Sequence, residues 1–275
     1  MFKHRDDLLR EVLRADKNLA AIEKRFGKRV DKLFRDVKVR VEALIRNPEL
    51  FDEQDRVKTA RMLSIANQMS AVLDDAGMDA LVEDYRDAFP ALTRDSLRYF
   101  ELLGEAPNLV GIDRQMLETY IDFTEDKLRG IVDRSLVAPL QQALFDEAFG
   151  GMTRQQVVDN VLARTDSLSP AQAQLVVGDS MAQYQRTVTA EKADALDLEV
   201  YLYQGPSDEI TSEQCQFMLD YDEHGLAGAF YKDEISADLH PNLRANPLIA
   251  GGHPRCRHRW TPVTLSFAKE MGFKE

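Results

Sequence analysis

Two cysteines and four histidines lie in the last quarter of the sequence, where their side chains could bind a metal ion. Cys215 stands alone, whereas His253, Cys256 and His258 lie within one short segment. Thiolate and imidazole are ligands that zinc prefers, and four of them complete a tetrahedral structural site. The sequence therefore predicts a zinc site formed by Cys215, His253, Cys256 and His258.

Simpler interpretations of the cysteines remain open. Cysteine is among the most frequently buried residue types, so Cys215 and Cys256 could pack together as reduced thiols. The first segment also lacks a Cys-x-x-Cys pair, because Met218 follows Cys215 at the position where a second cysteine would stand. Glu213 and His240 are reserve ligands only. A lasting disulfide is not expected in a reducing cytoplasm.

A complete catalytic constellation cannot be assembled from the sequence. A Cys/His nucleophilic pair would combine Cys215 or Cys256 with His253, but no orienting acid or oxyanion loop accompanies them. The glycines separate helical segments and form no phosphate-binding loop. We therefore expect no catalytic residues, no cofactor-binding residues and no enzymatic activity. A zinc-assisted nuclease centred on His253, Cys256 and His258 is the enzymatic alternative.

Length and composition indicate a charge-rich folded protein. The 275 residues are 44% hydrophobic and 30% charged, which is typical of a globular chain with one or two domains and not of a disordered one. No apolar run has the length needed to cross a bilayer, and the polar N-terminus lacks a signal-peptide core. We therefore expect a protein made in a cytoplasm, with no membrane contact.

The charge is unevenly distributed along the chain. Residues 1–50 contain 14 Lys and Arg against 9 Asp and Glu, whereas the remainder contains 21 against 38. Such an acidic body disfavours extended contact with DNA phosphates. The basic residues 1–50 could make limited contact with nucleic acid or with an acidic protein surface, although a solvated helix face is the simpler interpretation.

The residues before the metal-ligand candidates have helical periodicity almost throughout. Apolar residues recur at helical spacing over 8–22 and, after Gly27, over 30–45, until Asn47-Pro48 ends the pattern. Further helical pattern covers about 52–75, 78–88, 93–103, 112–149, 154–164 and 170–196.

Interruptions and strands complete the expected order of elements. Residues 104–111 form the clearest linker, and Pro139 should kink or interrupt the helix around it. Large apolar and aromatic residues predict a short strand over 198–203. The composition of residues 221–256 predicts mostly loop. Residues 257–263 are predicted to form a second strand, with its alternating arginines on the outward face.

These elements predict a mainly α protein, with a long-helix N-terminal region followed by a small α+β C-terminal domain. The helical N-terminal region spans residues 1–110. The second region spans residues 111–275, with long helices over 112–196, a small α+β module over 197–265 and a tail.

A series of motifs follows Ser180. In order, they are the helical segment Arg186-Thr187-Val188-Thr189-Ala190-Glu191-Lys192-Ala193, the strand Val200-Tyr201-Leu202-Tyr203, the turn Asp208-Glu209-Ile210-Thr211 before Cys215, the segment His253-Pro254-Arg255-Cys256-Arg257-His258, and the strand Trp260-Thr261-Pro262-Val263. This order resembles the phage Mu F-like head-morphogenesis family of minor head proteins. The family pattern has cysteines where Met218 and His258 stand here, so a family metal site would have lost one ligand and exchanged another.

The resemblance implies a structural protein of the virion and not an enzyme. Such a minor head protein associates with the portal vertex and the capsid interior, and it assists head assembly or DNA delivery. Its partners would be the portal protein, the capsid protein or both, and it would be made in the host cytoplasm. Besides the nuclease, a cytoplasmic helical adaptor with a zinc-stapled module is an alternative.

Overall fold

The computed structural model describes residues 2–150, 152–236, 239, 246–250, 256 and 258–274. They form two compact units, each assembled from segments that are separate in the sequence. Unit 1 consists of Met1–Ile22, Ala88–Asp122 and Gly178–Glu275, and unit 2 consists of Glu23–Asp87 and Phe123–Val177. Each compact unit therefore combines residues from both sides of position 110. The predicted boundary between two consecutive regions at this position stays a prediction.

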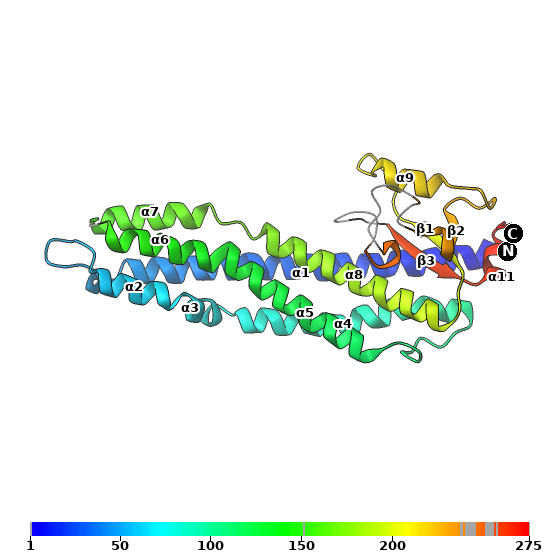
Figure 1. The fold of residues 1–275 in the computed structure, drawn as a ribbon, viewed down its shortest axis with the longest axis horizontal. Coiled ribbons are helices and arrows are strands. Elements are labelled where there is room, and N and C mark those ends of the chain that lie inside the picture. Colours follow the sequence, from blue (N-terminus) through cyan, green and yellow to red (C-terminus); the bar gives the residue numbers. More distant parts are fainter. Residues whose placement is uncertain are drawn as a thin grey trace. The chain divides into compact units, whose positions relative to one another are not determined.

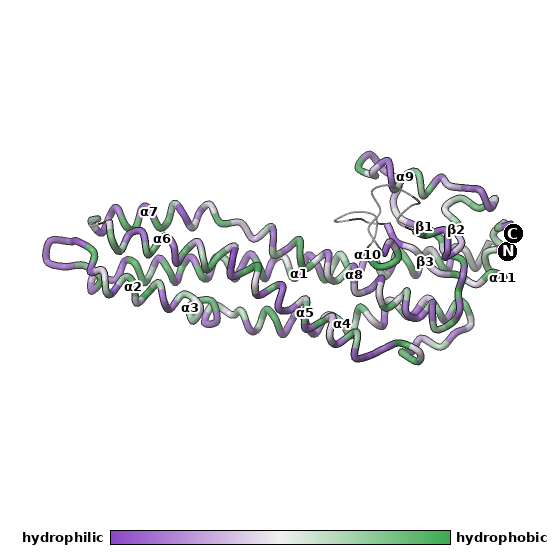
Figure 2. Tube along the Cα trace, viewed as in Figure 1, coloured by the Kyte–Doolittle hydropathy of each residue, from purple (hydrophilic) through white to green (hydrophobic). Residues whose placement is uncertain are grey.

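Helices dominate the chain, and a small antiparallel sheet lies near its C-terminal end, as predicted (Figure 1). The helical segments are α1 (Phe2–Ile45), η1 (Pro48–Leu50), α2 (Thr59–Asn67), α3 (Met69–Asp75), α4 (Met78–Arg98), η2 (Tyr99–Leu103), α5 (Arg114–Val132), η3 (Asp133–Val137), α6 (Ala138–Phe149), α7 (Arg154–Asp166), α8 (Ala171–Ala195), α9 (Glu213–Asp220), η4 (Lys232–Glu234), α10 (Pro247–Ala250) and α11 (Leu265–Glu270). Hydrophobic and hydrophilic residues alternate along the helices (Figure 2). Within the described ranges, no helix is both long and apolar enough to span a bilayer.

Unit 2 is built from helices whose apolar stripes meet in its core. The predicted stripe of α1 is buried there from Val30 to Ile45, and α6 packs against both α2 and α7. Gly27 does not interrupt α1, which is one continuous helix. A helical glycine costs only about 1 kcal/mol, and the burial of Phe26 and Val30 on either side outweighs that cost.

Two prolines inside helical pattern have different effects. Pro90 lies within α4, so the separate helices predicted over 78–88 and 93–103 are wrong. Phe89 and Leu92 are fully buried beside this proline, and their packing maintains the helix despite the lost hydrogen bond. Before Pro139, the π-helical segment η3 separates α5 from α6, which confirms the predicted interruption.

The sheet of unit 1 has the strand order β2-β1-β3, with β1 (Val200–Gln204) antiparallel to both neighbours. Its first residue, Val200, lies opposite Tyr231 of β2 (Ala229–Tyr231) and Val263 of β3 (Arg259–Val263). Strands β1 and β3 follow the sequence prediction closely. By contrast, β2 lies within the predicted loop over 221–256, because three residues are too few to produce a strand pattern.

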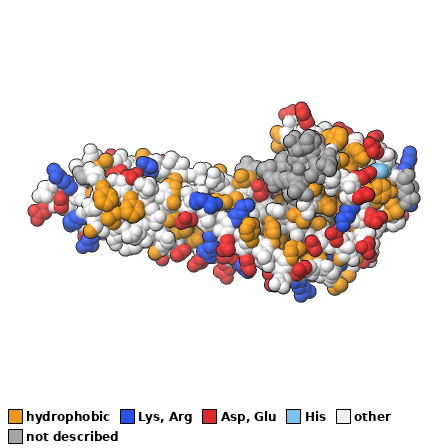
Figure 3. All heavy atoms as spheres, viewed as in Figure 1, with side chains coloured by type: hydrophobic (Ala, Val, Ile, Leu, Met, Phe, Trp, Pro, Cys, Tyr) orange, Lys and Arg blue, Asp and Glu red, His pale blue; other side chains and the backbone are white. Residues whose placement is uncertain are grey.

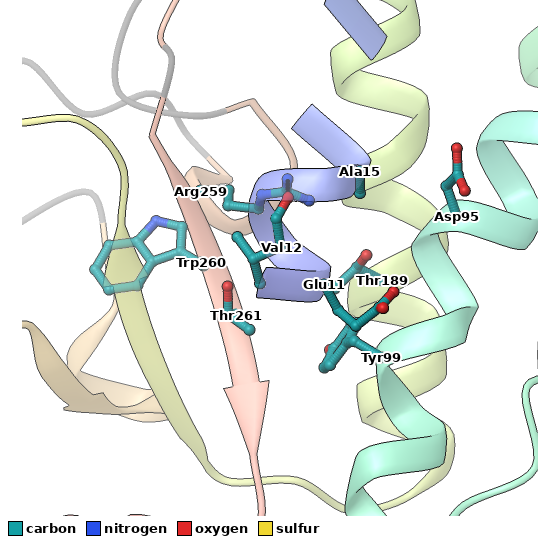
Figure 4. Close-up of a pocket in the computed structure, with 9 residues that line it drawn as sticks. All are labelled: Glu11, Val12, Ala15, Asp95, Tyr99, Thr189, Arg259, Trp260 and Thr261. Carbon is teal, nitrogen blue, oxygen red and sulfur yellow. Dashed lines mark hydrogen bonds between the residues drawn. The ribbon is translucent and has the colours of Figure 1, made fainter. Parts of the chain in front are cut away.

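A buried arginine joins β3 to the first turns of α1 within unit 1. Arg259 donates a hydrogen bond to the carbonyl of Val12 at 2.8 Å and forms an ion pair with Asp16. Its side chain is only 15% exposed, so the outward orientation predicted for the arginines of this strand is wrong at Arg259. Figure 4 shows Arg259, Tyr99 and Thr261 around an adjacent cavity of about 10 Å³, which has room for about one water molecule.

Asp16 should stabilise the fold mainly because its carboxylate compensates the charge of the buried Arg259 guanidinium. Burial lowers the pKa of Arg259, and burial also raises the pKa of Asp16 despite the attraction of the arginine. Replacing Asp16 with leucine should therefore lower the free energy of unfolding by about 2 kcal/mol, because it removes both the negative charge and the side-chain hydrogen-bond acceptor beside Arg259.

The matched variant Asp16→Asn should cost less than about 1 kcal/mol, since its amide oxygen still accepts from Arg259. Urea unfolding measures both changes. Asp36→Leu removes an exposed i,i+4 pair with Lys32 and serves as the control. Equal losses for Asp16→Leu and Asp36→Leu would contradict this role of the buried pair.

Candidate metal centre

Cys215 enters the core of unit 1 from the first turn of α9. The hydroxyl of Ser212 caps this helix by accepting a hydrogen bond from the backbone N–H of Cys215 at 3.2 Å. The helix turns Cys215 and Met218 inward, and both are fully buried. Met218 therefore fills core volume at the position where a second cysteine would have stood.

Cys256 and His258 come from the segment that leads into β3. Both are buried, and their backbone carbonyls accept hydrogen bonds from the guanidinium of Arg186 on α8, at 2.7 and 3.3 Å respectively. Cys256 and His258 are therefore both hydrogen-bonded to a helix of the same unit. Arg186 belongs to the helical motif in the sequence, but nothing in the sequence indicates this role.

The three side chains form a buried group that could hold a metal ion. The sulfurs of Cys215 and Cys256 are 3.8 Å apart, and Nδ1 of His258 is 3.9 Å from the Cys256 sulfur. All three donor atoms lie within 4.8 Å of one another. Tetrahedral zinc with Zn–S bonds of about 2.3 Å separates two sulfurs by about 3.8 Å, and a sulfur from an imidazole nitrogen by about 3.6 Å. The sulfur–sulfur distance therefore matches this ion, and the sulfur–nitrogen distance is slightly longer than the ideal.

The orientation of His258 leaves the correct ring nitrogen available for a metal. Its Nε2 lies 2.8 Å from the carbonyl oxygen of Pro206. Because a carbonyl can only accept, Nε2 must carry the proton, and in the neutral ring Nδ1 then presents its lone pair on the side of Cys256. The ring also stacks on Tyr203, with 5.4 Å between centroids and 8° between planes. Gly205 also lies so close to the His258 ring that a side chain at position 205 would collide with it.

Tyr203 connects the two sulfurs through its hydroxyl group. The hydroxyl donates a hydrogen bond to the Cys215 sulfur at 3.2 Å and lies 3.7 Å from that of Cys256. Burial raises the pKa of Tyr203, so its phenol stays protonated and remains a donor. In the metal-free protein, the hydrogen bond with Cys256 and burial raise the pKa of the Cys215 thiol. Without a metal, the Cys215 sulfur is therefore a poor nucleophile.

The arrangement suits a structural role better than catalysis. The three donors are at most 7% exposed, whereas a catalytic metal keeps a coordination position open to substrate. A metal here would instead connect α9 to the start of β3, which are more than thirty residues apart in the sequence. Its binding energy would add to the stability of unit 1.

The structure describes only some of the predicted ligands. It brings together Cys215, Cys256 and His258, while His253 and the reserve ligand His240 lie outside the described residues. The other reserve ligand, Glu213, is exposed on α9 and is not part of the buried group. The contributions of Tyr203 and of the carbonyl of Pro206 were not predicted. An aromatic strand followed by Gly-Pro indicates only a strand and a turn.

Zinc affinity at this centre should fall steeply as the pH decreases. Because the metal-free thiol of Cys215 has a raised pKa, metal binding must displace protons from sulfur. If both thiols lose a proton, the affinity should fall by about 100-fold per pH unit, so the stability conferred by zinc is greatest at high pH and lost on acidification. Competition with a chromophoric chelator across neutral pH measures the slope. A pH-independent affinity, after correction for the chelator, would contradict ligation by these thiols.

Comparison with known proteins does not identify a family. No protein-family model matches the chain, and no curated protein and no solved structure matches it significantly. Its function must therefore be inferred from its own residues.

Proposed function

We propose that this chain is a minor head protein of the phage Mu F-like family, a non-enzymatic virion component whose C-terminal module is held together by zinc. In this role it binds the portal protein or the capsid protein inside the head and assists head assembly or DNA delivery. The proposal starts from the order of motifs after Ser180. Its main structural support is the meeting of Cys215 and Cys256, which belong to two different motifs, at 3.8 Å between sulfurs.

The buried group supports zinc over other common ions. Two sulfurs and one imidazole nitrogen suit zinc, whereas magnesium and calcium require oxygen ligands. Structural zinc sites have four ligands, so the three described donors leave one position for a further ligand. His253 stays the predicted fourth ligand. The proton on Nε2 of His258 and the hydroxyl of Tyr203 supply the outer hydrogen bonds that orient metal ligands.

The distribution of charge is compatible with a protein that binds proteins inside a head. The acidic remainder of the chain would repel packaged DNA. The basic residues of α1 include Lys17, Lys24 and Lys28, whose exposed side chains could contact an acidic protein surface or make limited contact with DNA.

Co-purification tests this function. The full chain is expressed together with the portal protein of the same phage or prophage, and the complex is isolated by size-exclusion chromatography. We expect one peak that contains both proteins and about one zinc per chain, measured by elemental analysis. The capsid protein is tested in the same way.

Two variants separate the two parts of the proposal. Cys256→Ser should remove the zinc, and Lys127→Glu, an exposed change on α5, should leave zinc and complex unchanged. Failure to bind either the portal or the capsid protein would contradict the head-protein assignment. Stoichiometric zinc together with cleavage of added DNA would favour the nuclease instead.

A further inference from the structure

The two cysteines of the candidate metal centre are also placed to react with each other. Cys215 and Cys256 are the only cysteines in the sequence, and their sulfurs lie 3.8 Å apart without a disulfide between them. A disulfide joins its sulfurs at about 2.05 Å, so a closer approach by less than about 2 Å would connect them. Each sulfur therefore has one possible intramolecular partner, and no third thiol competes for it.

Zinc ligation and a disulfide exclude each other at this pair. Zinc binds the thiolate form of cysteine, whereas a sulfur in a disulfide has given up that negative charge. Both cross-links would nevertheless join the same two places in the fold, which are the first turn of α9 and the residues before β3, 41 positions apart. The C-terminal module can therefore be held together by the metal or by a covalent bond, but not by both at once.

The surroundings of the pair favour a small and uncharged oxidant. Cys215 is completely buried and Cys256 is 7% exposed, so a bulky reagent cannot reach either sulfur. Between Lys192 and Lys232 the chain has nine Asp and Glu and no Lys or Arg, and Figure 3 shows acidic side chains at the surface in the region of α9. This charge repels anionic oxidants such as oxidised glutathione. Hydrogen peroxide is neutral and only slightly larger than water.

We infer that Cys215 and Cys256 form a peroxide-sensitive switch, in which oxidation joins the two sulfurs by a disulfide and releases the zinc. In the zinc-loaded protein both sulfurs are thiolates. Cys256, the more exposed of the two, attacks one oxygen of hydrogen peroxide. The O–O bond breaks, and a sulfenic acid and a hydroxide ion form. The thiolate of Cys215 then attacks the sulfenic sulfur, the S–O bond breaks, and a second hydroxide leaves as the disulfide forms.

The reaction needs no reagent other than peroxide and solvent protons. The two thiolates together lose two electrons, and these electrons reduce the peroxide. Two protons from solvent convert the two hydroxide ions into two water molecules. The zinc ion loses both sulfur ligands at once, and the imidazole of His258 does not complete a closed site without them.

The biological setting of this switch rests on the proposed function, because a virion component leaves the reducing cytoplasm in which it was made. Inside the cell the thiols stay reduced, and zinc holds the module together. After release, an oxidising environment favours the disulfide. The module thus keeps a cross-link in both environments.

Peroxide treatment of the full zinc-loaded chain tests the inference. We expect about one zinc per chain to pass to a chromophoric chelator, and non-reducing peptide mapping to show a linked pair of peptides that contain Cys215 and Cys256. Dithiothreitol should separate these peptides and restore zinc binding. A chain whose cysteines stay thiols, or become sulfinic or sulfonic acids without a disulfide, would overturn the inference.

Two controls establish that the reaction takes place within the folded protein. Oxidised glutathione should form the disulfide at least about tenfold more slowly than hydrogen peroxide at the same concentration, because it is bulky and anionic. Equal rates would indicate a reaction of the unfolded chain and would contradict the switch. Cys256→Ser should stay monomeric on a non-reducing gel, since its remaining sulfur has no partner within the chain. Rapid dimer formation by this variant would contradict the intramolecular pairing.

Urea unfolding shows whether the disulfide replaces the metal as a cross-link. Chelation should lower the urea midpoint of the reduced zinc-loaded chain and leave that of the oxidised chain unchanged, because a covalent bond does not depend on the metal. An oxidised chain that unfolds at the midpoint of the reduced metal-free chain would argue against this replacement.

The possible failures of the inference and of the proposed function can be told apart. A zinc-loaded chain that keeps both thiols under peroxide would refute the switch alone. A chain that switches but binds neither the portal nor the capsid protein would refute the head-protein assignment alone. A chain that is purified from zinc-supplemented cells without zinc would refute both the zinc-stapled module and the switch.

Discussion

Cys256→Ser is expected to abolish zinc binding and to lower the free energy of unfolding of unit 1 by about 4 kcal/mol when free zinc exceeds the dissociation constant of the native protein a thousandfold. The substitution removes one of three buried donors while it preserves the size of the side chain. Even with His253 as the predicted fourth ligand, the sulfur of Cys215 and the nitrogen of His258 would leave only three ligands, whereas a closed structural site needs four. Elemental analysis of the purified protein and urea unfolding measure the two effects.

The wild-type protein after chelation provides the reference for this result. It should have the stability of Cys256→Ser to within about 1 kcal/mol, because both lack the metal and differ by one buried thiol. Adding zinc should stabilise only the wild type. If the cysteines pack together merely as reduced thiols, chelation will leave the unfolding curve of the wild type unchanged, and the metal assignment would then be wrong.

Gly205→Ala should weaken zinc binding by about 100-fold or more although it leaves all three donors in place. A Cβ at position 205 would lie 2.3 Å from Cδ2 and 2.7 Å from Cγ of His258, which is far inside van der Waals contact. The imidazole would have to move, and it would lose both its hydrogen bond to Pro206 and the position of Nδ1 near the sulfurs. Chelator competition measures the affinity.

Gly130→Ala is the matched control for this substitution. Gly130 lies in α5, and an added Cβ would come no closer than 4.0 Å to the guanidinium of Arg134. Alanine should stabilise this helix by up to about 1 kcal/mol and leave zinc affinity unchanged. Comparable zinc affinities for Gly205→Ala and the wild type would show that His258 is not a ligand in the proposed geometry.

The sequence predicts best those elements that have a long hydrophobic periodicity or whose ends carry capping residues. The helices α7 and α8 were predicted to within a few residues, because a capping box at Thr153 and Ser169-Pro170 mark their starts. The fold class follows from such segments. The short strand β2 was missed, and α4 was wrongly divided at Pro90, since packing around a proline decides whether a helix continues.

The candidate metal centre was predictable in its ligand types but not in its surroundings. Cys215, Cys256 and His258 stand out because soft ligands are rare in this chain. Their meeting depends on the antiparallel pairing of β1 with β3 and on the inward face of α9, which local patterns do not specify. Arg259 was assigned to an outward face because alternation indicates which residues share a side and not which side is covered.

The hydrogen bond and ion pair from Arg259 to the first turns of α1 have a consequence for the order of folding during synthesis. Val12 and Asp16 leave the ribosome about 240 residues before their partner Arg259 on β3. The central strand β1 likewise lacks both neighbours until β2 and β3 have emerged. All segments of unit 2 precede residue 178, so unit 2 can fold first, and unit 1 can close only after β3 has been synthesised.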